Sequence, residues 1–285
     1  MLVGVPGGNS SGENGGSIHL DFRPPGPVLA PYVHTFYLFR TEAALEGVER
    51  VGLGNIRFVL RGEGSARFAS GREAASRPVS ITAPPAAAIA YRLKGPFVCF
   101  GVSLRPLGWS ALTGLNARAS AERIIDGATL YGQDALALHT QLQAMETIEA
   151  MAIATEAFLL RHLRAVPETH HRLARAVREW ELSPDPTIES LYARVDMSPR
   201  QVARLLNQYY GGPPKLLERK VRATRAAIAL VRGVDPNEVA GMFYDQAHMI
   251  RELRQFLGHT PRSLRERADP VLEMMLLREP LPQAD

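Results

Sequence analysis

Two segments in the C-terminal third constrain the fold of this chain more than any other feature. The first, "SPRQVARLLNQYYGG", runs from Ser198 to Gly212, and the second, "DQAHMIRELRQFLG", runs from Asp245 to Gly258. Each begins with a residue that caps helices, repeats apolar side chains at helical spacing and ends on glycine. In the first segment Pro199 also occupies the first helical position, where a missing N–H costs nothing. We therefore predict two amphipathic helices.

Each predicted helix has an apolar face and a polar face. The apolar side chains, which we expect to face a core, are Val202, Leu205, Leu206 and Tyr209 in the first helix and Met249, Ile250, Leu253 and Phe256 in the second. The polar side chains left for the outside are Arg200, Gln201, Arg204 and Gln208 in the first and Gln246, His248, Arg251, Arg254 and Gln255 in the second. Arginine and glutamine can bond base edges in a major groove, and arginine also neutralises phosphate. The alternative is an ordinary amphipathic surface helix.

The basic charge of the chain is concentrated around these helices. Residues 172–267 contain 17 Lys and Arg against 11 Asp and Glu, a balance of +6. The remainder has 16 against 18, a balance of −2, within a total of +4. This asymmetry favours a polyanionic partner for the C-terminal third.

A shorter helix precedes the first amphipathic helix. Thr187 is a suitable cap for it, and "VDM" (195–197) forms a tight connection to Ser198. Two short helices joined by a few residues, the second with a polar face, are typical of a helix-turn-helix unit. Because the stretch before Asp245 repeats this order, we predict two such units.

Residues 172–267 resemble the AraC-type DNA-binding domain, in which a long helix joins two helix-turn-helix units. The resemblance rests on three pieces in the order that the family has, namely "MSPRQVARLLNQYYGGPPK", "LLERKVRATRAAIAL" and "YDQAHMIRELRQFLGHTPRSLRER". It implies a transcriptional regulator whose partners are double-stranded DNA and RNA polymerase. The positions that it assigns to DNA reading are Arg200, Gln201, Arg204, Gln246, Ala247, His248 and Arg251. It places Arg222 and Ala226 on the linking helix, where we expect packing and a salt bridge.

The sequence departs from the family pattern in both turns. Asp196 stands where the first turn usually has glycine, and aspartate tolerates a left-handed backbone better than most residues. The second unit is about two residues shorter between Ala240 and Asp245, and Pro236 occupies a normally apolar position. We therefore expect a shortened or rotated support helix, with Gly241 as the new turn glycine.

The N-terminal part has a different texture, typical of short strands. Segments of four to eight residues, rich in aromatic and β-branched side chains and bounded by turn residues, indicate a small barrel or sandwich. They are "HTFYLF", "IRFVLRG", "SARFAS", "PVSITA", "IAYRLKG" and "FVCFGVSL", followed by "RPLGW", which we expect to turn the chain from strand into helix. The predicted class is α+β, a small β-barrel or sandwich followed by connector helices and an all-α double helix-turn-helix domain. The predicted parts are a flexible tail (1–25), a β-rich sensor or dimerisation domain (26–132), a helical connector (133–166), a DNA-binding domain (167–269) and a C-terminal tail (270–285).

Residues 31–132 are similar to the N-terminal domain of one branch of AraC-type regulators. This implies a sensor or dimerisation module, with a small-molecule effector in the mouth of the barrel and a homodimer as the assembly. Ligand pockets are mostly apolar with few polar groups. The candidate contacts are Tyr37, Tyr91, Arg105 and Trp109, each of which could equally be a packing residue.

Other function classes find little support. The single cysteine, Cys99, lies in an apolar run and can form neither an intrachain disulfide nor a paired-cysteine zinc site. The neighbours His170 and His171 do not make a metal site, and no catalytic motif is present. We expect no enzyme activity, no cofactor, no metal, no membrane span and a cytoplasmic location. The alternative function is a ligand-binding or protein-interaction module with a degenerate DNA-binding domain, which the shortened second unit motivates.

Overall fold

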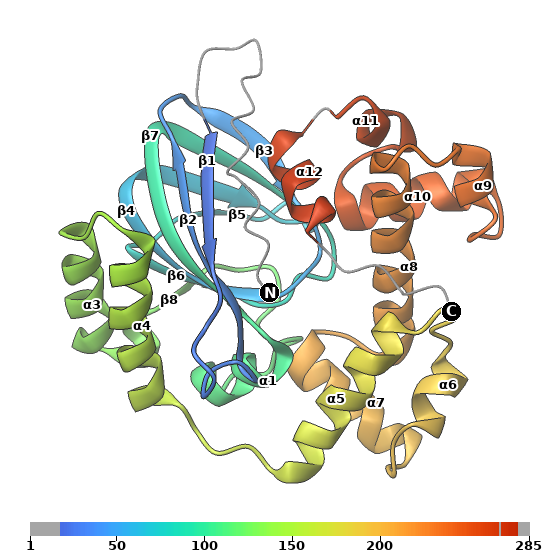
Figure 1. Cartoon of the computed structure of the whole chain (residues 1–285), viewed down its shortest axis with the longest axis horizontal. Coiled ribbons are helices and arrows are strands. Elements are labelled where there is room, and N and C mark those ends of the chain that lie inside the picture. Colours follow the sequence, from blue (N-terminus) through green and yellow to red (C-terminus); the bar gives the residue numbers. More distant parts are fainter. Residues whose placement is uncertain (1–17, 268, 279–285) are drawn as a thin grey trace, which may run out of the picture.

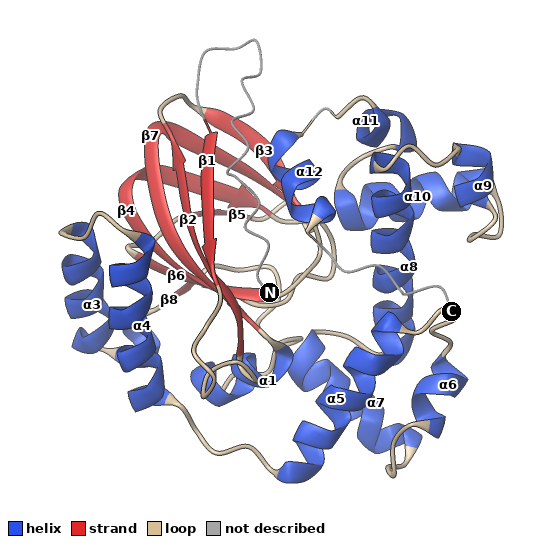
Figure 2. Ribbon diagram, viewed as in Figure 1, coloured by secondary structure: helices blue, strands red, loops and turns tan. Residues whose placement is uncertain are grey.

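The computed structural model describes residues 18–267 and 269–278. An antiparallel sheet with two flanking helices forms the N-terminal part, and the C-terminal part is entirely helical (Figures 1 and 2). The predicted class, a β-rich domain followed by an all-α region, is confirmed. Most of the predicted N-terminal tail and the end of the C-terminal tail lie outside the described residues.

The sheet contains eight strands in the order β1-β2-β7-β4-β6-β8, with β3 paired to β7 and β5 paired to β4. The strands are β1 (Ile18–Arg23), β2 (Val33–Thr41), β3 (Leu45–Glu49), β4 (Gly54–Arg67), β5 (Glu73–Ala75), β6 (Val79–Thr82), β7 (Ile89–Leu104) and β8 (Ile125–Asp126). Two pairs of expected strands are fused, because β4 and β7 pair along nearly their whole lengths and continue through Gly62 and the cis Gly95–Pro96 bond. Strand β1 corrects the expectation that residues up to 25 form a tail, since it pairs with β2.

Alternate residues of the central strands serve opposite faces of the sheet. Phe36, Leu38, Ile56, Phe58 and Phe100 are fully buried against the helices of the N-terminal part. The intervening side chains, such as Tyr37, Arg57 and Cys99, face the other side of the sheet, whose strands are curved (Figure 1). One face of the sheet therefore builds a core, and the other face is left to line a cavity.

Two helices cover the core face of the sheet. They are α3 (Gln133–Gln143) and α4 (Ile148–His162), reached through α1 (Pro106–Gly108), the π-helical turn η1 (Trp109–Thr113) and α2 (Ala128–Tyr131). Leu138, Leu142, Met151 and Phe158 join the same core as the strands. The segment expected to be a connector is thus a layer of the N-terminal domain (Figure 1), and the expected turn at "RPLGW" is confirmed.

The C-terminal part is organised around one long helix, α8 (Pro214–Val231), which runs between two groups of helices (Figure 1). The first group is α5 (Glu168–Leu182), α6 (Ile188–Ala193) and α7 (Pro199–Tyr210). The second is α9 (Pro236–Ala240), α10 (Gln246–Leu257), α11 (Pro261–Arg265) and α12 (Pro270–Leu277). Helix α12 corrects the expected tail, because Leu272 and Leu276 are buried in the core of the second group. No helix within the described ranges combines the length and apolar character needed to cross a membrane.

Candidate nucleic-acid interface and the cavity behind it

Helix α7 is built by its caps and its apolar stripe, as the sequence predicts. The Ser198 hydroxyl accepts the Gln201 N–H at 3.3 Å, and Gln201 Oε1 accepts the Ser198 N–H at 3.0 Å, which completes a capping box. Gly211 ends the helix with a left-handed φ of 79°. The predicted stripe is buried with Trp180 and Leu191 in one apolar core, and its members are Val202, Leu205, Leu206 and Tyr209. The outer face of α7 is therefore fixed toward solvent.

Helix α10 is built in the same way. Asp245 caps it by accepting the His248 N–H at 2.6 Å, and Gly258 ends it with φ of 75°. Met249, Leu253 and Phe256 are fully buried. We refer to α7 and α10 together as the reading helices.

A buried ion cluster attaches α10 to α8, and the sequence analysis anticipated only the salt bridge of Arg222 within it. The Glu252 carboxylate, 1% exposed, accepts Arg219 Nε at 2.6 Å and Arg222 Nη2 at 3.1 Å. His248 Nε2 lies 3.2 Å from the same carboxylate. Burial alone would raise the pKa of Glu252, but the hydrogen bonds from the two arginines outweigh it and hold the pKa below its ordinary value. The packing and salt-bridge role predicted for Arg222 and Ala226 is confirmed, since Ala226 is fully buried.

The turn of the second unit differs from expectation in one respect. Helix α9 spans Pro236–Ala240, and so the predicted shortening of the support helix is confirmed. Gly241 has φ of −60° and ψ of −18°, a right-handed conformation that any residue adopts. The prediction that it is the turn glycine is therefore wrong, because the shorter connection closes without a left-handed residue.

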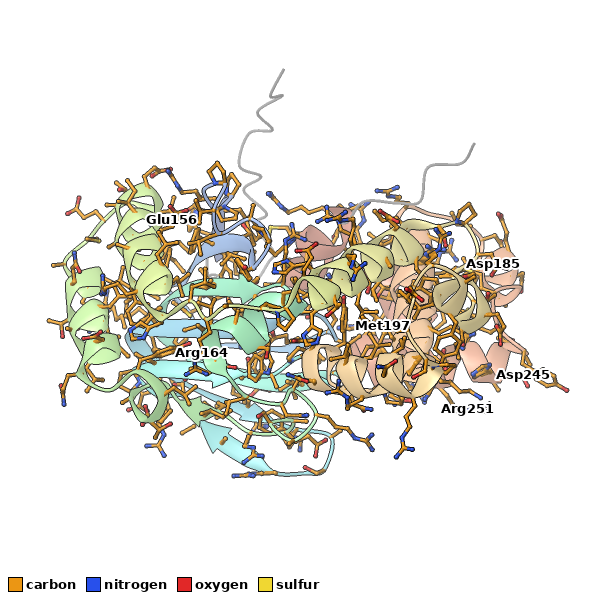
Figure 3. The ribbon with its side chains drawn as sticks, turned by 90° about the horizontal axis from the view of Figure 1, so that it is seen from below. Glu156, Arg164, Asp185, Met197, Asp245 and Arg251 are labelled. Carbon is orange, nitrogen blue, oxygen red and sulfur yellow. The ribbon has the colours of Figure 1, made fainter. Side chains whose placement is uncertain are left out.

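Most of the predicted DNA-reading side chains lie on solvent-facing surfaces. Exposed residues are Arg200, Gln201 and Arg204 on α7 and Gln246, Ala247, Arg251 and Arg254 on α10. Two others are turned inward, since Gln208 lies 3.5 Å from Ser110 Oγ of the N-terminal part and His248 pairs with Glu252. Figure 3 places Asp245 and Arg251 at the outer edge of the helical part, away from Glu156 and Arg164. Seven of the nine residues predicted to read DNA are therefore exposed.

A cavity of about 1070 Å³ lies between the curved face of the sheet and the helical part. Its walls come from the strands on one side and from α5, α8 and α12 on the other. Tyr37, Tyr91 and Arg105 line it, as predicted for ligand contacts. Trp109 does not line it, because its side chain is fully buried in the N-terminal core with its indole N–H donated to Leu115 O at 2.9 Å.

The sheet side of the cavity holds a polar group of three residues. Arg57 Nε donates to the Tyr37 hydroxyl at 2.8 Å, and its guanidinium also contacts the Glu49 carboxylate. Burial by itself would lower the pKa of Arg57, but Glu49 and Tyr37 keep it above its ordinary value, so the guanidinium is charged. Cys99 lies nearby, and burial raises the pKa of its thiol to about 12. A buried thiol with a raised pKa is chemically inert.

The helical side of the cavity is basic, which the sequence alone did not indicate. Lys220 of α8 is only 8% exposed, and no hydrogen-bond partner for its ammonium is found among residues 18–267 and 269–278. Burial lowers its pKa to about 8, while Glu181 acts in the opposite direction. Arg178 of α5 faces the same space, as does Arg105. Burial lowers the pKa of Arg105, and the like charge of Arg178 lowers it further. The cavity therefore gathers cationic groups from both parts of the chain.

The two neighbouring histidines have structural partners. His170 Nδ1 lies 2.5 Å from the Tyr209 hydroxyl, and His171 packs edge-on against Tyr32. Within the described part of the chain, no group of three or more potential metal ligands occurs.

A match to one protein family agrees with the geometry of the helical part. Residues 191–267 match the family described as a helix-turn-helix domain. The chain is similar to the structure of ToxT from Vibrio cholerae, at 7% identity over 80% of this chain and 97% of that chain, with a TM-score of 0.46. It is also similar to ToxT from Vibrio cholerae O395 bound to (E)-4-(8-methylnaphthalen-1-yl)but-3-enoic acid, at 8% identity over 85% and 98%, with a TM-score of 0.45. A third similar structure is the AraC-like transcriptional activator CuxR, at 14% identity over 74% and 82%, with a TM-score of 0.35. No curated protein matches the sequence.

Proposed function

We propose that this chain, whose residues 191–267 match a helix-turn-helix domain family, is an AraC-type transcriptional regulator that reads DNA with both reading helices. The observation that carries the proposal is the pair of capped helices whose Arg and Gln side chains are exposed while their apolar stripes are buried. Helices of this kind place their N-terminal residues against base edges in the major groove. Two such units would bind successive grooves, about one helical turn of DNA apart.

The test is selection of DNA from a random duplex library by the full-length protein, followed by anisotropy titrations at two salt concentrations. We expect at least about a thousandfold preference for the selected duplex over a scrambled one. Equal, weak and salt-sensitive binding to both duplexes would contradict the proposal, since it would mean that the basic surface attracts DNA by its charge alone and does not read its sequence. The alternative function, a module with a degenerate DNA-binding domain, would then be favoured.

The cavity supports control by a small-molecule effector. Its aromatic and aliphatic wall, which includes Phe39, Leu93 and Phe97, suits an apolar body. Lys220 has no hydrogen-bond partner among the described residues, and Arg105 and Arg178 are like charges that face the same space. An anionic group between these cations would give the buried ammonium a hydrogen-bond acceptor and would relieve the repulsion. The effector class that we propose is therefore an amphipathic anion.

The protonation of Lys220 gives this effector a pH signature. An anion stabilises the charged lysine, so binding raises its pKa above the value of about 8 in the free protein. Affinity for an aryl or alkyl sulfonate, which stays ionised, is then constant below about pH 8 and falls at higher pH. Isothermal titration calorimetry of the wild type and of Lys220→Met tests this, because the variant loses affinity and pH dependence together. A sulfonate that binds both proteins equally would exclude Lys220 as the anchor.

Two protein partners and the location of the chain remain proposals. The outer face of α4 exposes Ile153 (62%) and Leu160 (45%), which supports a second copy of the chain as a partner. Light scattering of the wild type and of Ile153→Glu tests this, since a dimer would become a monomer in the variant. RNA polymerase as a partner and a cytoplasmic location follow from the proposed regulator role, and a reporter assay of transcription addresses the former.

A further inference from the structure

Backbone N–H groups of the N-terminal domain donate hydrogen bonds to the last turn of each reading helix, and we call each of these two contacts a grip. At α7, the backbone N–H groups of Ala117 and Arg118 donate to the carbonyls of Gln208 and Asn207 at 2.9 and 3.1 Å. At α10, the N–H groups of Ala88 and Val51 donate to the carbonyls of Gln255 and Phe256, both at 2.8 Å. The final carbonyls of a helix have no partner within the helix. Loops of the sheet domain therefore supply the C-terminal caps of both reading helices.

Each grip is reinforced by an apolar residue and a glycine. Leu107 of the N-terminal domain is buried in the core around α7, and Val51 is buried in the core around α10. A Cβ atom on Gly211, which ends α7, would lie 2.8 Å from Pro84 O, and one on Gly258, which ends α10, would collide with Val48. Both helix ends are thus seated closely against the same sheet domain, at separate places.

We propose that the N-terminal domain is a brace that sets the separation and orientation of the two reading helices, and through them the half-site spacing that the protein accepts. The inference rests on the proposed DNA-binding function. Without the brace, the two units are joined through α8, which packs on both. A second rigid connection between the units closes a ring (Figure 1), and a closed ring resists the bending and twisting that a lone helix allows.

The brace predicts a specific dependence on DNA spacing. Two linked binding units gain most affinity when the connection matches the span between their sites. A loose connection accepts other spans as well, but it gives a lower affinity at the best span. The cavity lies inside the ring, between the sheet and α8. An occupant of the cavity touches both sides of the ring, so it can alter the separation that the brace sets.

The test compares full-length proteins on selected duplexes whose two half-sites are moved apart by one to five base pairs. The double variant Ala88→Pro with Ala117→Pro removes one N–H donor from each grip. Ala87→Pro is the matched control, since no hydrogen bond from the Ala87 N–H is found among the described residues. We expect the wild type and control to lose at least about tenfold in affinity on respacing, while the double variant loses much less and binds the optimal duplex more weakly. Identical spacing profiles for all three proteins would overturn the brace.

A covalent lock keeps the test decisive if the proline variants unfold. The Arg118 N–H donates to the Asn207 carbonyl at 3.1 Å, which brings the two backbones close together, so Arg118→Cys with Asn207→Cys places two thiols across one grip, and the buried native Cys99 does not interfere. The oxidised lock should keep both the affinity and the spacing profile of the wild type. Loss of DNA binding on oxidation, restored by reduction, would show that the grip must open and would contradict the brace. Failure to select any specific duplex would count against the proposed function instead, so the two failures are distinguishable.

Discussion

The two helix-turn-helix units present similar outer faces but are held by different interactions. Helix α7 rests on an apolar core that contains Trp180, and its support helix α6 has six residues. Helix α10 follows a support helix of only five residues, α9, and is tied to α8 by the buried Glu252 carboxylate. A charge cluster therefore supplies, in the second unit, part of the attachment that hydrophobic contacts supply in the first. This difference shows that a helix-turn-helix unit with a shortened support helix can still keep its folded structure.

Removing the carboxylate is expected to have the largest effect. Glu252→Ala leaves Arg219 and Arg222, which are 32% and 27% exposed, without their shared acceptor. We expect a loss of about 3 kcal/mol in unfolding free energy, measured by urea denaturation. Because the pKa of Glu252 is below its ordinary value, its contribution is present at neutral pH and is lost as the pH falls below about 4.5. Glu266→Ala, which removes a surface ion pair with Arg262, is the control and should resemble the wild type.

Whether both units read DNA is tested by one arginine from each. Arg204→Ala and Arg251→Ala should each weaken specific binding by about 1–3 kcal/mol in anisotropy titrations if each residue contacts a base. Arg67→Ala, an exposed arginine on β4, serves as the control. A loss confined to Arg204→Ala would mean that the second unit has kept its structure but not its reading role. Two unchanged affinities would refute the assigned faces.

The glycines that end the reading helices separate backbone strain from contact with the N-terminal domain. Gly211→Ala and Gly258→Ala combine a left-handed φ with a close neighbour, whereas Gly233→Ala has φ of 91° and open space around its Cβ. The control should lose about 1 kcal/mol from strain alone, and the other two more. Thermal unfolding measures all three. Equal losses would mean that the contacts with Pro84 and Val48 contribute nothing.

The N-terminal caps should give the smallest and most similar effects. Ser198→Ala and Asp245→Ala each remove one side-chain acceptor from the first turn of a reading helix and should cost about 1 kcal/mol. Hydrogen exchange of the first-turn amides would place each loss in its own helix. A much larger loss for Asp245→Ala would indicate that the second unit depends on its cap as well as on Glu252.

Local chemistry made helices α7 and α10 predictable. The caps at Ser198 and Asp245, the ends at Gly211 and Gly258 and the apolar stripes depend on residues within four positions of one another, and they are found as expected except that Ile250 is only partly buried. The expected strand boundaries were wrong where pairing with a neighbouring strand continues a strand through residues that usually end one. Strand β7, for example, continues through Gly95 and Pro96. Gln208 and His248 were predicted to lie on the outer faces, but both are turned inward. Gln208 contacts Ser110, which is distant in sequence, and His248 pairs with the buried Glu252 one turn along the helix.

The sequence by itself determined that α7 and α10 are helices, which side of each is mainly polar and where the basic charge lies, because these follow from spacing and composition within short windows. Only the tertiary structure decided that α3 and α4 cover the sheet, that Lys220 and Arg105 face one cavity, and that loops of the N-terminal domain cap both reading helices. Such features join residues that lie far apart in the sequence, such as Val51 and Phe256, which are separated by more than two thirds of the chain and whose hydrogen bond no local pattern encodes. The physical reason is that burial and hydrogen-bond satisfaction are properties of the packed chain as a whole.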